Sequence, residues 1–231
     1  MLKYKYKKVL AAFTVVCLST TILSGCSFNN KKVVFSNKLE DSELFKINGE
    51  CFRSSEGLVF LLAEKNRYES VYGSECWNNV ISEDTMESLV KDEVKDGLAR
   101  LKITCLMAKD NNIKLSKEEK DTAKQCGKNY YNALSKETIE YMNIKEDTAI
   151  QAFEDYMLEQ KVIDKLGKNA KYSEDATPGE IEDAKNEVFL DSYNEYIKNI
   201  SSEFNDDEWD KYKLSDSVEA VDFYQYISNV S

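Results

Sequence analysis

Apolar residues recur at steps of three and four along most of the chain after residue 54, which is the spacing of one face of an α-helix. Leu58 and Val90 each begin such a stripe. The pattern predicts helices over 54–72, from 84 or 85 to about 111, over 116–134, 135–141 and 147–166, and from 177 to about 200, with a short helical or irregular piece over 207–227.

Residues that cap helices stand at several of these boundaries. Ser54 or Ser55 can cap the first helix, and Gly73 can end it. The run 116–119 (SKEE) has the pattern of a capping box, in which a serine and a glutamate satisfy free backbone N–H groups. The run 177–180 (TPGE) offers a threonine cap, a proline at the first helical position and a glutamate at the third. These signals predict the starts of two helices independently of the apolar pattern.

The segment before the first helix has a different pattern. Two β-prone runs, 33–35 and 44–47, precede an Asn-Gly pair at 48–49, which is a turn signal before Cys51 and Phe52. With one proline and eight glycines in the whole chain, the composition favours helices over a turn-rich β fold. The predicted fold class is therefore mainly α, with a small N-terminal β element.

The first 25 residues have the layout of a secretory signal peptide. Residues 1–8 carry four lysines and no acid, and an uncharged run over 9–23 follows. This run is diluted by threonine and serine, and it falls short of the ~20 apolar residues that a membrane-spanning helix needs. The Leu-Ser-Gly-Cys sequence over 23–26 resembles the lipobox of bacterial lipoproteins. That resemblance implies that Cys26 receives a diacylglyceryl group and becomes the mature N-terminus.

Lipidation of Cys26 would anchor the protein without a spanning helix. Two acyl chains on one residue give stable anchoring, because each buried CH2 contributes about 0.8 kcal/mol. We expect the protein to lie on the extracytoplasmic face of a bacterial cell membrane, with residues 26–32 as a lipid tether. Residues 33–166 then form the main helical part, 167–176 a linker, and 177–231 a C-terminal segment.

Charge and composition exclude several function classes. Removal of residues 1–25 takes away four lysines and no acid, so the formal net charge moves from −11 to −15. A chain this acidic, with no basic stripe, is not expected to bind nucleic acid. Histidine is absent, which removes the commonest general base and zinc ligand and argues against catalysis.

The cysteines do not indicate a metal site. Besides Cys26, the mature chain has Cys51, Cys76, Cys105 and Cys126, and none of their spacings forms a CxxC pair. Four cysteines in an exported protein allow three disulfide connectivities, and the sequence does not choose among them. Cys105 falls on an apolar helical stripe and is expected to be a small buried residue. No cofactor or metal is expected.

Three stretches resemble the N-terminal chaperone domain of the extracytoplasmic foldases of the SurA and PrsA type. They are ELFKINGECF at 43–52, NRYESVYGSECW at 66–77 and LMAKDNNIKLSKEEK at 106–120. The resemblance covers roughly residues 33–166 and implies a helical chaperone-type domain. The matching positions are Asn48-Gly49-Glu50, Tyr68-Glu69, Tyr72-Gly73 and Trp77, and Ala108 with Ile113, Leu115, Ser116, Glu118 and Glu119.

The chain departs from that family after residue 166. Such foldases usually carry a parvulin prolyl-isomerase domain there, whereas here a short linker is followed by a segment, 187–209, that looks like the returning C-terminal helix alone. The resemblance therefore implies an ATP-independent holder of unfolded exported polypeptides without prolyl-isomerase activity. The fold would include a returning C-terminal helix that packs on the first part.

A protein of this type would bind clients through aromatic and apolar surface between its helices. Each such aromatic residue could instead belong to the core. The candidate client-binding residues are Tyr68, Tyr72, Trp77, Tyr130, Tyr131, Tyr193 and Tyr196.

Three other functions are alternatives to the chaperone interpretation. A carboxylate enzyme could use 206–208 (DDE), although acids there suit the start of a helix. A solute-binding lipoprotein would need alternating strands and helices, which the pattern lacks. The main alternative is a structural or interaction lipoprotein that binds one defined envelope partner.

Overall fold

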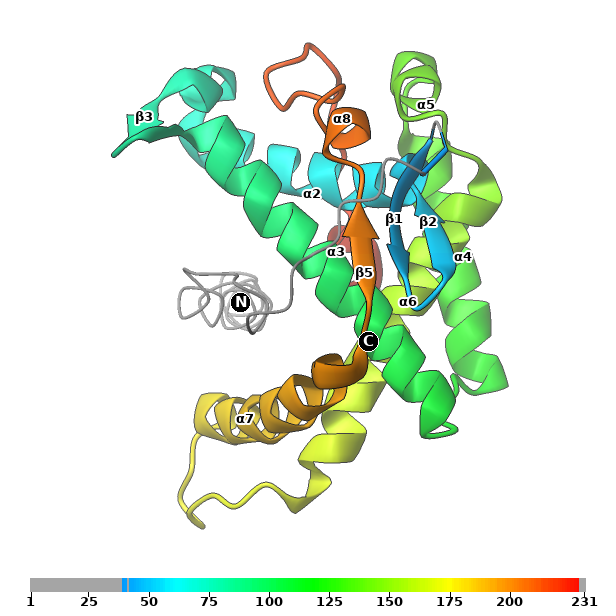
Figure 1. The fold of residues 1–231 in the computed structure, drawn as a ribbon, viewed down its shortest axis with the longest axis vertical. Helices are drawn as coiled ribbons and strands as arrows, with labels where there is room; N and C mark the ends of the chain where they lie inside the picture. Colours follow the sequence, from blue (N-terminus) through cyan, green and yellow to red (C-terminus); the bar gives the residue numbers. More distant parts are fainter. Residues whose placement is uncertain (1–38, 41, 229–231) are drawn as a thin grey trace, which may run out of the picture.

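A computed structural model describes residues 39–40 and 42–228 of the chain (Figure 1). The predicted signal peptide, the predicted lipidation site Cys26, the expected tether and the β-prone run 33–35 lie outside the described residues. In the part that the structure describes, no helix combines the length and the apolar character needed to cross a membrane.

The fold is mainly α with a small antiparallel sheet near the N-terminal end, which confirms the predicted class. The two strands of the first hairpin run directly into the helices, and the remaining short strands are inserted between helices. The helices are α2 (Ser54–Tyr72), α3 (Met86–Asp110), α4 (Lys117–Ala133), α5 (Lys136–Met142), α6 (Glu146–Leu166), α7 (Pro178–Tyr196), α8 (Asp206–Trp209) and α9 (Gln225–Ser228), with 3-10 turns η2 (Ser74–Asn78), η3 (Gly167–Asn169) and η4 (Ile197–Asn199).

Helix starts follow the capping signals at two of the three expected places. Both predicted capping boxes form, at Ser116 before α4 and at Thr177 before α7. The first helix differs, because its N-cap is Arg53 and Ser54 is already helical. The reason is that strand β2 leads directly into α2 and holds Arg53 in an extended conformation, while the Ser54 amide donates to the Ser42 carbonyl.

The sheet joins the N-terminal hairpin to a short strand that follows α7. Its strands are β1 (Glu43–Ile47), β2 (Glu50–Arg53) and β5 (Ser202–Phe204), in the antiparallel order β2-β1-β5. Asn48 and Gly49 have φ angles of 48° and 87°, so the predicted hairpin turn forms with both central residues in the left-handed region. Strand β5 follows α7 and was not predicted, and neither was the small ribbon of β3 (Val80–Ile81) and β4 (Asp84–Thr85).

One continuous core includes residues from both parts of the chain. It runs from Leu44 on β1 through the long helices to Leu214 and Phe223, which are both fully buried. The expected linker begins as η3, and Gly167 there lies directly against Lys185 of α7. Helix α7 packs on α6 and η3 (Figure 1). The C-terminal segment therefore packs on the first part through a helix, a strand and buried side chains near the end of the chain.

Candidate functional site

Large apolar side chains are exposed mainly at one end of the molecule. Five of the six that are exposed in the described part of the chain lie between residues 71 and 89, and the sixth is Tyr172. Burying one such side chain stabilises a protein by about 1.5–3 kcal/mol, so exposed clusters usually mark binding surfaces. We call this cluster the apolar end; it consists of Val71 (68% exposed), Tyr72 (62%), Val80 (70%), Ile81 (44%) and Leu89 (38%).

The apolar end rests on a buried aromatic support. Helix α2 stops at Gly73, whose φ of 79° suits glycine, and the chain turns into η2. Trp77 is 1% exposed, its Nε1 donates to Glu69 Oε1 at 2.8 Å, and its ring lies 5.9 Å from that of Tyr68. Glu69 in turn pairs with Lys65 at 2.6 Å. These contacts fix the end of α2 against the turn that follows it.

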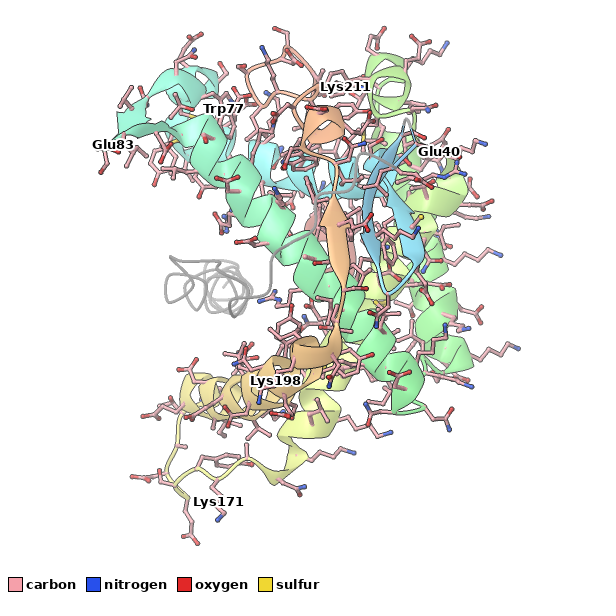
Figure 2. All side chains as sticks on the ribbon, viewed as in Figure 1. Glu40, Trp77, Glu83, Lys171, Lys198 and Lys211 are labelled. Carbon is pink, nitrogen blue, oxygen red and sulfur yellow. The ribbon has the colours of Figure 1, made fainter. Side chains whose placement is uncertain are left out.

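The ribbon β3–β4 presents the outermost part of this surface. Val80 pairs with Thr85 and Ile81 with Asp84, and Ser82 at the turn adopts a φ of 61°. The base of the ribbon is held by a hydrogen bond from the Met86 amide to the Asn79 carbonyl at 2.8 Å. Figure 2 shows Glu83 at the tip of the ribbon, with Trp77 nearer to the helices. The exposed side chains of β3 are therefore displayed on a short ribbon with a defined register.

A pocket of about 480 Å³ lies near the opposite end of α3. Tyr196 is half-buried there and donates to Asp110 Oδ2 at 2.7 Å, and burial together with this bond raises the pKa of Tyr196 to about 12. Two of the polar side chains that line the pocket are thus already bonded to each other. The pocket is lined by Asn48, Met107, Asp110, Asn111, Leu166, Ser192, Glu195, Tyr196, Asn199 and Ile200.

The seven predicted client-binding aromatics do not form one surface. Tyr130 is fully buried and Tyr193 is 9% exposed, so both belong to the core, as Trp77 does. Tyr130 makes edge contacts with the rings of Phe153 and Phe223. Tyr131 is half-buried on α4. Of the seven, the structure brings together Tyr68, Tyr72 and Trp77 on or beneath the apolar end and places Tyr196 at the pocket.

The aliphatic members of the apolar end were missed from the sequence. Val71 lies outside the apolar stripe that buries Leu58 and Leu62 on the same helix. Its position off this stripe was the sequence signal that could have predicted its exposure. Val80 and Ile81 form only a two-residue run, which has no period that would predict its burial or exposure.

The four cysteines that the structure describes offer no reactive centre at the apolar end or at the pocket. Cys51, Cys76, Cys105 and Cys126 are all free thiols in the structure, so none of the three possible connectivities is formed. Burial raises the pKa of the Cys76, Cys105 and Cys126 thiols, which disfavours the nucleophilic thiolate. Within residues 39–40 and 42–228, no group of three or more Cys, Asp or Glu side chains is arranged to hold a metal ion.

Comparison with family models, with curated proteins and with solved structures found no match to this chain. The resemblance to foldases of the SurA and PrsA type therefore stays a prediction from the three stretches that carry it. The function is inferred from the surface itself.

Proposed function

We propose that this protein is a membrane-anchored extracytoplasmic lipoprotein that holds unfolded exported polypeptides without ATP and without prolyl-isomerase catalysis. The observation that carries the proposal is the gathering of exposed apolar side chains at the apolar end. An unfolded chain exposes apolar segments that a folded client hides, so a surface of this kind distinguishes the two states of a client.

The apolar end suits weak and reversible binding. Contact with Val71, Tyr72, Val80, Ile81 and Leu89 removes apolar area from water, but association also costs translational freedom and the ordering of the bound segment. The net affinity of so small a surface is therefore modest. A holder needs such modest affinity, because it must release its client for folding.

The proposed anchor is the lipid on Cys26. A labelled fatty acid supplied to bacteria that express the full chain should mark the wild-type protein and leave Cys26→Ala unmarked. Label on the Cys26→Ala protein, or no label on the wild type, would overturn the anchor. This experiment is independent of client binding.

Aggregation assays test the holding activity. The mature protein should suppress the aggregation of several unrelated unfolded proteins without ATP, and the variant Tyr72→Ser/Val80→Thr/Ile81→Thr should suppress it several-fold less. Tyr172→Ser is the matched control, since Tyr172 is 53% exposed and lies outside the apolar end. Full suppression by the triple variant would contradict the proposal.

The alternative is an interaction lipoprotein with one envelope partner, which is supported by the buried, hydrogen-bonded aromatic residues beneath the apolar end. A fixed surface favours one complementary partner. Stoichiometric capture of a single folded envelope protein, without suppression of general aggregation, would favour this alternative.

A further inference from the structure

We infer that the apolar end selects unfolded polypeptide segments in which apolar side chains are flanked by lysine or arginine. This inference rests on the proposed holding function and names its substrate class. It follows from the charges that surround the exposed apolar side chains.

The stretch of chain that forms the apolar end is acidic. Between Arg67 and Lys91 the sequence contains no basic residue and five acids. Two of these acids already have internal partners, because Glu69 pairs with Lys65 and Glu87 accepts the amides of Leu214 and Ser215. The other three, Glu75, Glu83 and Asp84, are exposed, and they make no ion pair with any residue that the structure describes.

The two cations that border this stretch in the sequence are bonded to other residues. Arg67 pairs with Glu64 at 2.6 Å and lies over the ring of Tyr68. Lys91 is 9% exposed, and its Nζ donates to the Trp209 carbonyl at 3.1 Å. Neither side chain is therefore available to neutralise the exposed acids of the apolar end.

The ribbon brings apolar and acidic side chains into register. Ile81 and Asp84 are directly paired across β3 and β4, which places their Cβ atoms about 4.5–5.5 Å apart. Glu83 lies beside them at the tip (Figure 2). A segment that places an apolar residue next to a lysine can contact both side chains of this pair at once.

The same charges disfavour a lipid surface as the occupant. Apolar side chains at a protruding tip can also insert into a bilayer, and membrane-binding surfaces of that kind carry lysine and arginine. Glu75, Glu83 and Asp84 would instead face the anionic phosphates of such a surface. Charge complementarity therefore favours a basic polypeptide.

Two labelled unstructured peptides with the same apolar centre test the inference, one flanked by lysines and the other by glutamates. Fluorescence anisotropy with the full mature protein should show about tenfold tighter binding of the lysine peptide at low salt. Each exposed ion pair contributes little to the binding free energy, but three pairs formed together account for this difference. The preference should shrink at high salt.

Matched variants separate the apolar end from the general acidity of the protein. Glu75→Gln/Glu83→Gln/Asp84→Asn should lose the preference and still bind the lysine peptide through its apolar centre. Asp121→Asn/Glu137→Gln/Asp191→Asn removes the same charge from exposed positions elsewhere and should keep the preference.

The outcomes distinguish this inference from the proposed function. Equal affinity for both peptides, or an equal loss of preference in the two variants, would overturn the inference and leave holding activity intact. Binding of neither peptide, with no suppression of aggregation, would overturn both. Tight binding to anionic vesicles that Tyr72→Ser/Val80→Thr/Ile81→Thr abolishes, with no peptide binding, would identify a lipid surface and overturn the inference.

Discussion

Lys102 lies within the helical core on α3 and is 4% exposed. Its Nζ is 2.5 Å from Asp155 Oδ2 on α6 and 2.5 Å from Glu56 Oε2 on α2. Burial by itself would lower the pKa of Lys102, but the two carboxylates outweigh it and raise that pKa above its usual range. The lysine therefore stays charged and links three helices.

Replacing Lys102 by Met should lower the free energy of unfolding by about 3–5 kcal/mol, because it leaves two partly buried carboxylates without their cation. Urea denaturation followed by circular dichroism measures the change. Lys109→Met on the same helix is the control, since the Lys109 side chain is 71% exposed and pairs with Glu50, and it should change stability by less than about 1 kcal/mol. Equal effects of the two variants would rule out a special role for the buried cluster.

Glu64 is a buried acid that loses its proton only near neutral pH. It is 5% exposed, and burial raises its pKa to about 7, with Glu93 adding to the effect and Arg67 opposing it. The unfolded chain releases this proton near its ordinary pKa of 4.5. Between these two pKa values the folded state holds a proton that the unfolded state has lost, so stability falls as pH rises from about 4.5 to about 7.

The variant Glu64→Gln should lose this part of the pH dependence. Between pH 5 and pH 8 the free energy of unfolding of the wild type should fall by about 2–3 kcal/mol more than that of Glu64→Gln. Urea titrations at the two pH values give the comparison. Parallel pH profiles of the two proteins would show that Glu64 does not carry this dependence.

At the scale of elements, α4 and α6 cross at a glycine. A Cβ atom on Gly127 would lie 2.5 Å from Ile150 Cα and 2.7 Å from Ile150 N, which are backbone atoms and cannot move without the helix. Gly97 on α3 is also inside a helix, but nothing lies within 4 Å of its Cβ position. Close helix packing therefore requires glycine at position 127 and does not require it at position 97.

Alanine at these two positions should act in opposite directions. Gly127→Ala should destabilise the protein by about 1–3 kcal/mol, because the helices must separate. Gly97→Ala should stabilise it by about 0.5–1 kcal/mol, because alanine restricts the unfolded chain and favours helix. Thermal unfolding of both variants measures the signs, and destabilisation of similar size in both would refute the role of the α4–α6 crossing.

Short sequence motifs correctly predicted the helix starts and the hairpin turn that depend only on neighbouring residues. The capping boxes at Ser116 and Thr177 form, and the Asn-Gly pair at 48–49 makes the first hairpin. Strand β5 was missed because three residues have no period of their own, and its pairing partner β1 is distant in sequence. The cap at Ser54 or Ser55 was wrong because β2 enters the helix without a loop.

The candidate site was less predictable than the fold, because exposure is decided by tertiary packing. The sequence drew attention to aromatic residues, but Tyr130 packs against Phe153 and Phe223 inside the core. Val80 and Ile81 resemble core residues in type and are exposed only because their ribbon extends from the helices. Of the predicted set, Tyr72 alone is an exposed member of the apolar end.

At the scale of the whole molecule, the C-terminal segment completes the core of the preceding part. Phe223 is fully buried, and its ring stacks on that of Phe153 with centroids 4.0 Å apart. It also lies 5.3 Å from the ring of Phe60 on α2 and 5.8 Å from that of Tyr130 on α4. One residue near the end of the chain thus contacts three helices, so the two parts should unfold together.

Phe223→Ala should lower the free energy of unfolding by about 3–5 kcal/mol, because it leaves a cavity among these rings. Since the two parts share one core, the variant should still unfold in a single step, with circular dichroism and aromatic fluorescence changing at the same urea concentration. Tyr172→Ala, at an exposed position in the segment before α7, is the control and should change stability by less than about 0.5 kcal/mol. Two separate transitions in Phe223→Ala, with the helices from α2 to α6 unfolding as in the wild type, would show instead that the C-terminal segment is an independent unit.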